Sequence, residues 1–400
     1  MKESNCLDVK LPLRHQRIGD NGLPCYRPWE NGLQEFMGGL RLSGLFYEEV
    51  VRPTLESEFP GLSYSAARLG SGSEVLGYDT PRSADHEWGP RLDLFLTESD
   101  HKALAGEIEE LLRWRLPYRF MGYSTHWGEA DAEGVRITEE RSSRPVEHRV
   151  VVHTVRGFFE SWTGLDPYRR WEPADWLVVP QQRLLEMTAG RVYHDGIGEL
   201  GEARRKLAYY PRDVWMYLMA AQWRRVGQLE AFVGRTGEVG DDLGSSLVAA
   251  GLVRDLARLC FLQERRYAPY AKWFGTAFAR LRCAPQLGPV FERVLKASSW
   301  KEREEHLTVA YEGVAAAHNA LDVTPPLEAE VSLFHGRPFL VVHAERFATA
   351  IEGNIEDPLV RALPKGVGAA DQVTDNTDVL TSPKVYGGLR ALYGGLPNRC

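Results

Sequence analysis

The hydrophobic pattern changes its period part-way along the chain, and this change constrains the fold more than any other feature. The segment VEHRVVVHTV, residues 146–155, alternates β-branched and polar residues as a strand does. Beyond about residue 157, apolar residues recur at helical spacing instead. The pattern predicts an α+β fold, in which a small mixed-sheet domain is followed by a larger, mainly helical domain.

The expected elements lie on both sides of that change. Before it we expect a helix over 33–57, strands over 63–69 and 85–96, and a helix over 100–115. After it we expect helices over 212–233, 242–264, 270–282, 286–297 and 299–321, then a strand pair at 330–333 and 338–343. The predicted parts are an N-terminal arm (1–32), an α/β domain (33–157), a helical domain (158–322) and a C-terminal extension packed on the body (323–400).

The composition excludes several classes of protein. The chain has 400 residues, 44% of them hydrophobic and 26% charged, which is typical of a globular protein. A net charge of -7 opposes binding to long nucleic acids, which need a basic surface. The five cysteines are scattered without a Cys-x-x-Cys pair, and neither a signal-peptide core nor a membrane-length apolar run is visible. These features predict a cytoplasmic protein with reduced thiols and no membrane partner.

The segment LGSGSEVLGYDTPRSADHEWGPRLDLFL, residues 69–96, carries the expected chemistry. Gly70 and Ser71 follow a predicted strand, and a tight turn there offers backbone N–H groups to phosphates. Asp85 and Glu87 stand one residue apart at the expected start of the next strand, where both would point to one face. Adjacent carboxylates favour a divalent cation, Mg²⁺ or Mn²⁺, which also takes phosphate oxygens as ligands. The segment therefore predicts a site for a metal ion and a nucleoside triphosphate.

The same residues also have structural interpretations, and a third carboxylate is not fixed by the pattern. Ser83 and Asp85 suit a turn or helix cap, and Glu87 suits a solvated strand position. Glu147, early in the strand 146–155, is the candidate third acid; Asp93 and Asp195 are the alternatives.

A basic helical wall is expected in the second half of the chain. Arg254 and Lys272 are candidates for neutralising the β- and γ-phosphates of a nucleotide. The structural alternative is salt bridging with Asp255 and Glu264, together with aromatic packing between helices.

Two motifs resemble a known superfamily. Gly70-Ser71 and Asp85-His86-Glu87 resemble the Gly-Ser…Asp-x-Asp/Glu signature of the polymerase-β-like nucleotidyltransferases. The runs GSGSEVLGYD, SADHEWGPR and ERRYAPYAKWFGTAF resemble an uncharacterised bacterial family, a domain of unknown function assigned to that superfamily. The helical half is similar in placement to that of aminoglycoside nucleotidyltransferases, in which a helical lysine resembling Lys272 contacts the nucleotide. One departure is the run Trp88-Gly89-Pro90-Arg91, which should bend the strand that follows the acids.

The resemblance implies roles for individual residues. Asp85 and Glu87 would hold the metal, and Glu147 would join them as a catalytic residue. The residues that would bind the nucleotide are Gly70, Ser71, Ser83, Arg254 and Lys272.

The resemblance also implies a reaction. We expect Mg²⁺-dependent transfer of a nucleoside monophosphate from a triphosphate, with ATP as the expected donor, to a hydroxyl of a small molecule, with release of pyrophosphate. The alternatives are a non-catalytic nucleotide-binding or interaction protein that retains the fold, protein adenylylation, and a phosphohydrolase built on His194-Asp195. The sequence identifies neither the acceptor, nor the base, nor the oligomeric state.

Overall fold

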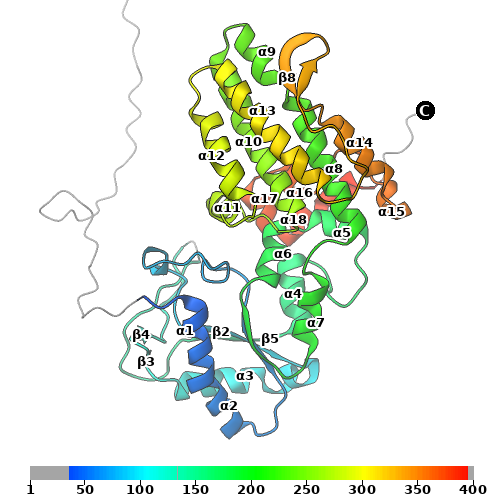
Figure 1. Cartoon of the computed structure of the whole chain (residues 1–400). Helices are drawn as coiled ribbons and strands as arrows, with labels where there is room; N and C mark the ends of the chain where they lie inside the picture. Colours follow the sequence, from blue (N-terminus) through cyan, green and yellow to red (C-terminus); the bar gives the residue numbers. More distant parts are fainter. Residues whose placement is uncertain (1–35, 133, 395–400) are drawn as a thin grey trace, which may run out of the picture. The chain divides into compact units, whose positions relative to one another are not determined.

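The computed structural model describes residues 36–132 and 134–394, and residues 38–400 form one compact unit. The expected N-terminal arm, residues 1–32, lies outside the described residues, as do Cys6, Cys25 and Cys400. The fold is α+β as predicted, with a small mixed sheet followed by a larger helical part (Figure 1). Within the described ranges, no helix is both long enough and apolar enough to cross a membrane.

A four-stranded mixed sheet positions the candidate site. Its strands are β1 (Ser65–Arg68), β2 (Arg91–Leu96), β5 (Arg149–Thr154) and β6 (Arg191–Asp195). Their spatial order is β5-β2-β1-β6. β2 pairs antiparallel with β1 and parallel with β5, while β6 pairs antiparallel with β1. β2 is therefore a central strand, and all six of its residues are buried.

Alternation and capping explain the elements around this sheet. In β5, Val150 and Val152 are buried whereas Val151 is 38% exposed, as the alternating pattern predicts. Helix α3 (Glu98–Arg115) packs on β5 and β2, and the Thr97 hydroxyl caps it by accepting from the Asp100 N–H at 3.1 Å. The remaining elements of this region are α1 (Gly39–Phe46), a π-helical turn (Tyr47–Val51), α2 (Arg52–Glu58), β3 (Arg119–Phe120) and β4 (Tyr123–Ser124).

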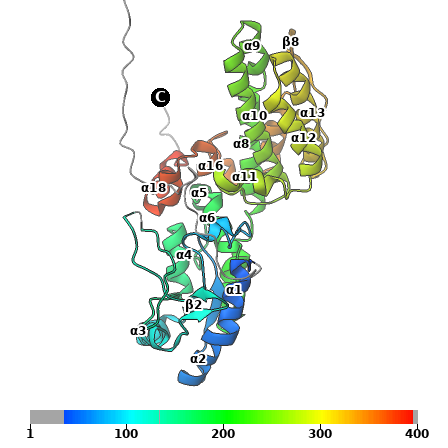
Figure 2. The ribbon, with the colours of Figure 1, turned by 90° about the vertical axis from the view of Figure 1, so that its left-hand side faces the viewer.

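The helical part confirms the expected helices. They are α8 (Arg212–Leu229), α10 (Asp242–Gln263), α11 (Ala271–Phe278), α12 (Ala284–Lys296) and α13 (Trp300–Asn319). Helix α9 (Phe232–Glu238) was not expected; it begins at the end of the range predicted for α8. Helix α10 packs against α8, α9, α12 and α13, and both views show these helices lying side by side (Figures 1 and 2). Trp223 of α8 stacks on Phe347 with ring centroids 4.4 Å apart, which anchors the following segment to the bundle.

Shorter elements connect the sheet region to the helices α8–α13, and others follow α13. Between them stand α4 (Val155–Thr163), α5 (Pro173–Val178), α6 (Gln181–Thr188) and α7 (Glu199–Lys206). After α13 come β7 (Ser332–Phe334), β8 (Arg337–Val341), α14 (Glu345–Gly353), α15 (Pro358–Arg361), α16 (Ala370–Val373), α17 (Thr377–Thr381), α18 (Pro383–Gly388) and a 3₁₀ turn (Leu389–Leu392). The expected strand pair in this tail is confirmed as β7 and β8.

The predicted strand over 85–96 is wrong in its first half. A 3₁₀ turn spans Arg82–Ala84, residues 85–90 form further turns, and the strand begins only at Arg91. Gly89 takes a φ of +151°, and Pro90 has no N–H to donate to a neighbouring strand. The Gly-Pro pair therefore delays the strand and leaves the two expected metal ligands outside it.

Strand β6 was not predicted. It lies within residues 158–322, which the sequence assigned to helices, so the sheet extends beyond the expected boundary at 157. Its Asp195 accepts hydrogen bonds from the N–H groups of Gly198 and Gly201 at the start of α7, at 3.1 and 2.9 Å. Asp195 thus ties the start of α7 to the sheet, and the His194-Asp195 pair forms part of strand β6.

Candidate functional site

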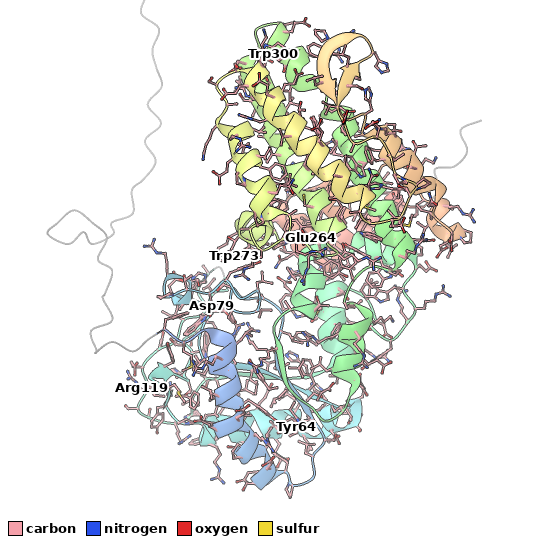
Figure 3. The ribbon with its side chains drawn as sticks, in the orientation of Figure 1. Tyr64, Asp79, Arg119, Glu264, Trp273 and Trp300 are labelled. Atoms are coloured by element: carbon pink, nitrogen blue, oxygen red, sulfur yellow. The ribbon has the colours of Figure 1, made fainter. Side chains whose placement is uncertain are left out.

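Most of the site residues predicted from the sequence line one cleft, which has a volume of about 900 Å³. Its walls come from the loop after β1, the turn before β2, helices α6, α10 and α11, and the segment 371–381. Figure 3 marks Trp273, which lines the cleft from α11. The expected site residues in its lining are Ser71, Ser83, Asp85, Glu87, Arg254 and Lys272.

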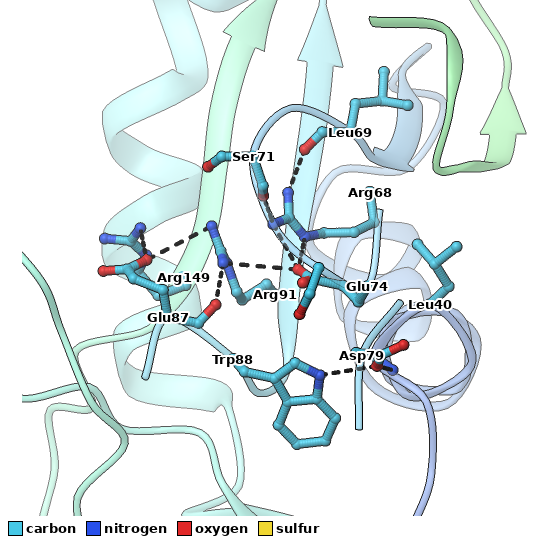
Figure 4. Close-up of polar contacts among 12 residues, drawn as sticks. Leu40, Arg68, Leu69, Ser71, Glu74, Asp79, Glu87, Trp88, Arg91 and Arg149 are labelled. Atoms are coloured by element: carbon cyan, nitrogen blue, oxygen red, sulfur yellow. Dashed lines mark hydrogen bonds and ion pairs between the residues drawn. The ribbon is translucent and has the colours of Figure 1, made fainter. Parts of the chain in front are cut away.

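The loop after β1 is shaped by glycine and by a buried arginine. Gly72 has a φ of +140°, and a β-carbon there would lie 2.3 Å from a carboxylate oxygen of Glu74. Arg68 lies beneath the loop and donates to the Ser71 carbonyl at 2.5 Å, to the Leu69 carbonyl, and to Glu74 at 2.7 Å (Figure 4). Arg68 was not among the residues predicted from the sequence; its signal was one charge at the end of the otherwise small and buried strand SAAR.

This loop presents donors to the cleft. The N–H groups of Gly72 and Ser73 make no hydrogen bond within the described residues, and both residues line the cleft. Backbone N–H groups in a turn of this kind bind anions. Gly70 does not line the cleft; its N–H donates to the Glu186 carbonyl at 3.0 Å, and its φ of +77° turns the chain.

Ser83 is held mainly by its own turn. Its hydroxyl oxygen accepts from the Thr80 N–H at 2.7 Å and lies 3.4 Å from the Ser73 hydroxyl. The capping interpretation of Ser83 therefore describes its contacts, while its place in the cleft lining keeps it within reach of a ligand.

Glu87 is bound by arginines. One of its carboxylate oxygens accepts from the Arg136 backbone N–H at 2.9 Å, and the other accepts from Arg149 at 2.8 Å. Arg91 lies 3.7 Å from the second oxygen (Figure 4). Glu87 itself has a φ of +44°, in the left-handed region, so it does not share a strand face with Asp85. Asp85 is exposed, with a carboxylate oxygen 2.7 Å from His86 Nδ1.

Asp85 and Glu87 do not share a strand face as expected, and their role as metal ligands stays a prediction. No group of three or more His, Cys, Asp or Glu side chains in residues 36–132 and 134–394 is arranged to hold a metal ion. Arginines already neutralise Glu87, which leaves Asp85 as the member of the pair that can offer oxygens. Mg²⁺ commonly takes one or two carboxylates and completes its shell with phosphate oxygens and water.

None of the three candidate third acids joins Asp85 and Glu87 in the cleft lining. Glu147 precedes β5 and pairs with Arg113 of α3 at 2.5 Å. Asp93 is buried on β2 and accepts from the Leu69 N–H at 3.1 Å. Burial alone would raise the pKa of the Asp93 carboxyl, but His153, Arg68 and that N–H together hold the pKa below its usual value. Asp93 is therefore charged, and its carboxylate is already held by contacts within the sheet.

The two cations expected in the helical wall differ in their pairing, and a third, Arg258 of α10, also lines the cleft and donates to the Asp371 carbonyl. Arg254 pairs with Asp375 at 2.7 Å. Lys272 forms no ion pair within the described residues; its ammonium lies 5.1 Å from the Trp273 ring centroid. Trp273 also stacks on Tyr78 at 5.1 Å, and Arg280 donates to the Gly77 carbonyl at 2.8 Å. These contacts hold the loop after β1 beside α11, and the loop donors and Lys272 line the same cleft.

Comparisons with known proteins give one family and one structure. A family model described as a domain of unknown function (DUF4037) matches residues 176–274, which run from α5 to α11 and include much of the helical wall. No curated protein matches the chain. A solved structure of a nucleotidyltransferase-like protein from Exiguobacterium sibiricum 255-15 is similar over 80% of this chain and 91% of that one, with 11% identity and a TM-score of 0.30.

Proposed function

We propose that this protein binds a nucleoside triphosphate in the cleft and transfers its nucleotidyl group to a hydroxyl of a small molecule. The observation that supports this proposal is convergence: residues expected from three separate segments line one cleft. The volume of about 900 Å³ falls within the roughly 300–1,000 Å³ that small-molecule sites occupy. ATP is the donor that we would test first.

Different lining residues would contact the phosphates and the base of the nucleotide. The Ser71 hydroxyl and the N–H groups of Gly72 and Ser73 would donate to phosphate oxygens, and Lys272 would neutralise phosphate charge. Tyr270 is 41% exposed in the same wall and offers a ring face to a base. In the reaction, the acceptor oxygen forms a bond to the α-phosphorus, the bond from that phosphorus to the bridging oxygen breaks, and pyrophosphate leaves with the electron pair. The acceptor hydroxyl proton passes to a base.

A magnesium ion is the expected companion of a triphosphate. Asp85 is the residue that we assign to it, together with phosphate oxygens, because arginines hold Glu87. The ion would supply positive charge along the phosphate chain.

A second candidate function is nucleotide binding without transfer. The observation that favours it is the neutralisation of Glu87 by arginines, combined with the lack of a three-ligand metal cluster among the described residues. Under this alternative the cleft binds the nucleotide and no pyrophosphate is released.

A thermal-shift assay with ATP, GTP, CTP and UTP, each with and without Mg²⁺, tests the proposal. We expect one triphosphate to raise Tm in the wild type and to lose that effect in Lys272→Ala. Lys301→Ala is the matched control, because Lys301 also lies over a tryptophan, Trp300, at 5.7 Å but does not line the cleft. Equal loss of the shift in both variants, or no shift with any nucleotide, would contradict nucleotide binding in this cleft.

Pyrophosphate release separates the two candidate functions. We expect slow release from the stabilising nucleotide by the wild type and none by Asp85→Asn. Binding without release in the wild type, across a panel of hydroxyl acceptors, would favour the non-catalytic function.

A further inference from the structure

A second, smaller cavity opens on the face of the sheet beside the cleft. Its volume is about 170 Å³, and it shares Ser71 with the cleft. Its charged lining comes from three neighbouring strands: Arg68 of β1, Arg91 and Asp93 of β2, and Arg149 and His153 of β5. The sequence predicted Asp85 and Glu87 at the start of the strand over 85–96. In the structure this strand starts at Arg91, and Asp93 follows two residues later.

Arg91 is buried, and ion pairs and a ring contact with Trp127 at 5.9 Å meet its charge more than hydrogen bonds do. Its side chain is 10% exposed, and its one hydrogen bond within the described residues goes to the Glu87 carbonyl. The carboxylates of Glu74 and Glu87 each lie 3.7 Å away, beyond hydrogen-bond distance. A guanidinium carries five N–H donors, so Arg91, which lines the cavity, has donors beyond this one hydrogen bond to offer a ligand.

The sheet register places a second arginine directly beside the first. Arg91 of β2 is paired with Arg149 of β5 across the parallel ladder. Like charges opposite each other destabilise a sheet. Glu87 lies near both guanidinium groups (Figure 4), and both also lie over the Trp127 ring, at 5.9 and 5.5 Å from its centroid. Burial and the neighbouring charges of Arg68 and Arg149 lower the pKa of Arg91 to about 10, against opposing effects of Glu74 and Glu87.

The other charged groups of the cavity already have partners. Asp93 accepts from the Leu69 N–H and lies 3.5 Å from Arg68 and 3.4 Å from His153. Arg68 donates to Glu74 and to the carbonyls of the loop. Two arginines, Arg91 and Arg149, therefore remain with unused donors beside the cavity.

We propose that this cavity is an oxyanion site in which Arg91 and Arg149 bind a phosphate group directly. The planar guanidinium fork matches the oxygens of a phosphate, and paired forks bind it through several charge-assisted hydrogen bonds. The cavity is smaller than the roughly 300 Å³ at the lower limit for small-molecule sites, so it admits a phosphate group and excludes a nucleoside. The ligand is inorganic phosphate, pyrophosphate or the end of the triphosphate bound in the cleft. For the last of these, the inference rests on the proposed function.

Titration with pyrophosphate and with inorganic phosphate in EDTA, at constant ionic strength, tests the site without a metal ion. We expect calorimetric binding of at least one of them to the wild type, weakened about tenfold or more in Arg149→Gln and in Arg91→Lys, since each variant loses charge-assisted hydrogen bonds. Arg119→Gln is the control: Arg119 is an exposed arginine of the same region, paired with Glu140, and should leave binding unchanged. Arg149 is more exposed than Arg91, so its variant keeps the test open if Arg91→Lys fails to fold.

Binding that requires Mg²⁺, or equal affinities in Arg149→Gln and Arg119→Gln, would overturn the oxyanion site. Parallel titrations with ATP and adenosine identify the source of the phosphate. If Arg149→Gln weakens ATP as much as pyrophosphate, the site holds the nucleotide's own phosphates. If pyrophosphate binds and ATP does not, the oxyanion site stands and the proposed function fails. If ATP binds with equal affinity to Arg149→Gln and Arg119→Gln, and neither variant binds pyrophosphate, the proposed function stands and this inference fails.

Discussion

Replacing Arg68 by methionine should destabilise the protein strongly, because this side chain holds the loop of the cleft from beneath. Arg68 is 4% exposed and donates to Glu74 at 2.7 and 3.0 Å and to the carbonyls of Leu69 and Ser71. In Arg68→Met, Glu74 stays buried, and its nearest remaining cation, Arg91, is 3.7 Å away. The variant therefore leaves a buried carboxylate without a hydrogen-bonded partner.

The size of this effect follows from the burial of the pair. Breaking a buried ion pair by removing one partner costs about 3–5 kcal/mol. That is a large part of the roughly 5–15 kcal/mol by which a typical domain is stable. Urea unfolding followed by circular dichroism at neutral pH measures the loss directly. Adding Glu74→Gln to Arg68→Met should recover part of it, because the amide removes the unpaired buried charge.

Arg119→Met provides a matched control, and an equal urea midpoint in the two variants would contradict the prediction. Arg119→Met removes an arginine of the same region whose pair with Glu140 is exposed, and should leave the urea midpoint unchanged. If Arg68→Met unfolds at the same urea concentration as Arg119→Met, the loop does not depend on the buried pair.

Three further predictions concern stability and the cleft loop. Burial raises the pKa of Glu230 to about 7 from an ordinary value of 4.5, so stability from its protonated form is present below about pH 4.5 and is lost as the pH rises through 7. Glu230→Gln should therefore gain up to about 3 kcal/mol over the wild type near pH 8 and little near pH 4, by urea unfolding; a gain independent of pH would contradict this. Burial lowers the pKa of His318 to about 4, so stability is present above about pH 6.5 and is lost as the pH falls through 4; the urea midpoint of His318→Gln should vary less over that range than that of the wild type. Gly72→Ala should lower both Tm and nucleotide affinity, because its β-carbon meets the Glu74 carboxylate, whereas Gly251→Ala in α10, where nothing lies within 4 Å, should lower neither.

The helices could be predicted from the sequence because their signals are local. Asp241 and Ser299 precede long apolar-periodic runs, and each caps its helix in the structure by accepting from an N–H three residues on. Strand β6 had no such signal. The segment RVYHD is short, and it becomes a strand by pairing with β1, more than a hundred residues away in the chain.

The sequence predicted which residues line the candidate site better than it predicted what those residues contact. Motif spacing and resemblance selected residues that meet in the cleft. Arg149, which pairs with Glu87, comes from β5, and the backbone N–H that donates to its other oxygen comes from residue 136, so no short pattern around Glu87 contains either. Arg91, four residues on, lies within such a pattern, but its position beside Glu87 depends on the turn before β2. The buried arginines Arg68 and Arg91 likewise acquire their environment from the sheet register, which the sequence does not state.

Hydrogen exchange with and without ATP tests most directly whether this cleft is the nucleotide site. We predict slower exchange over residues 70–77, where the Gly72 and Ser73 N–H groups have no acceptor within the described residues, and over 268–274 of the opposite wall. The hairpin of β7 and β8 does not line the cleft and should exchange at the same rate in both states. Protection confined to other regions, or no change over 70–77 at ATP concentrations that raise Tm, would contradict binding in the cleft.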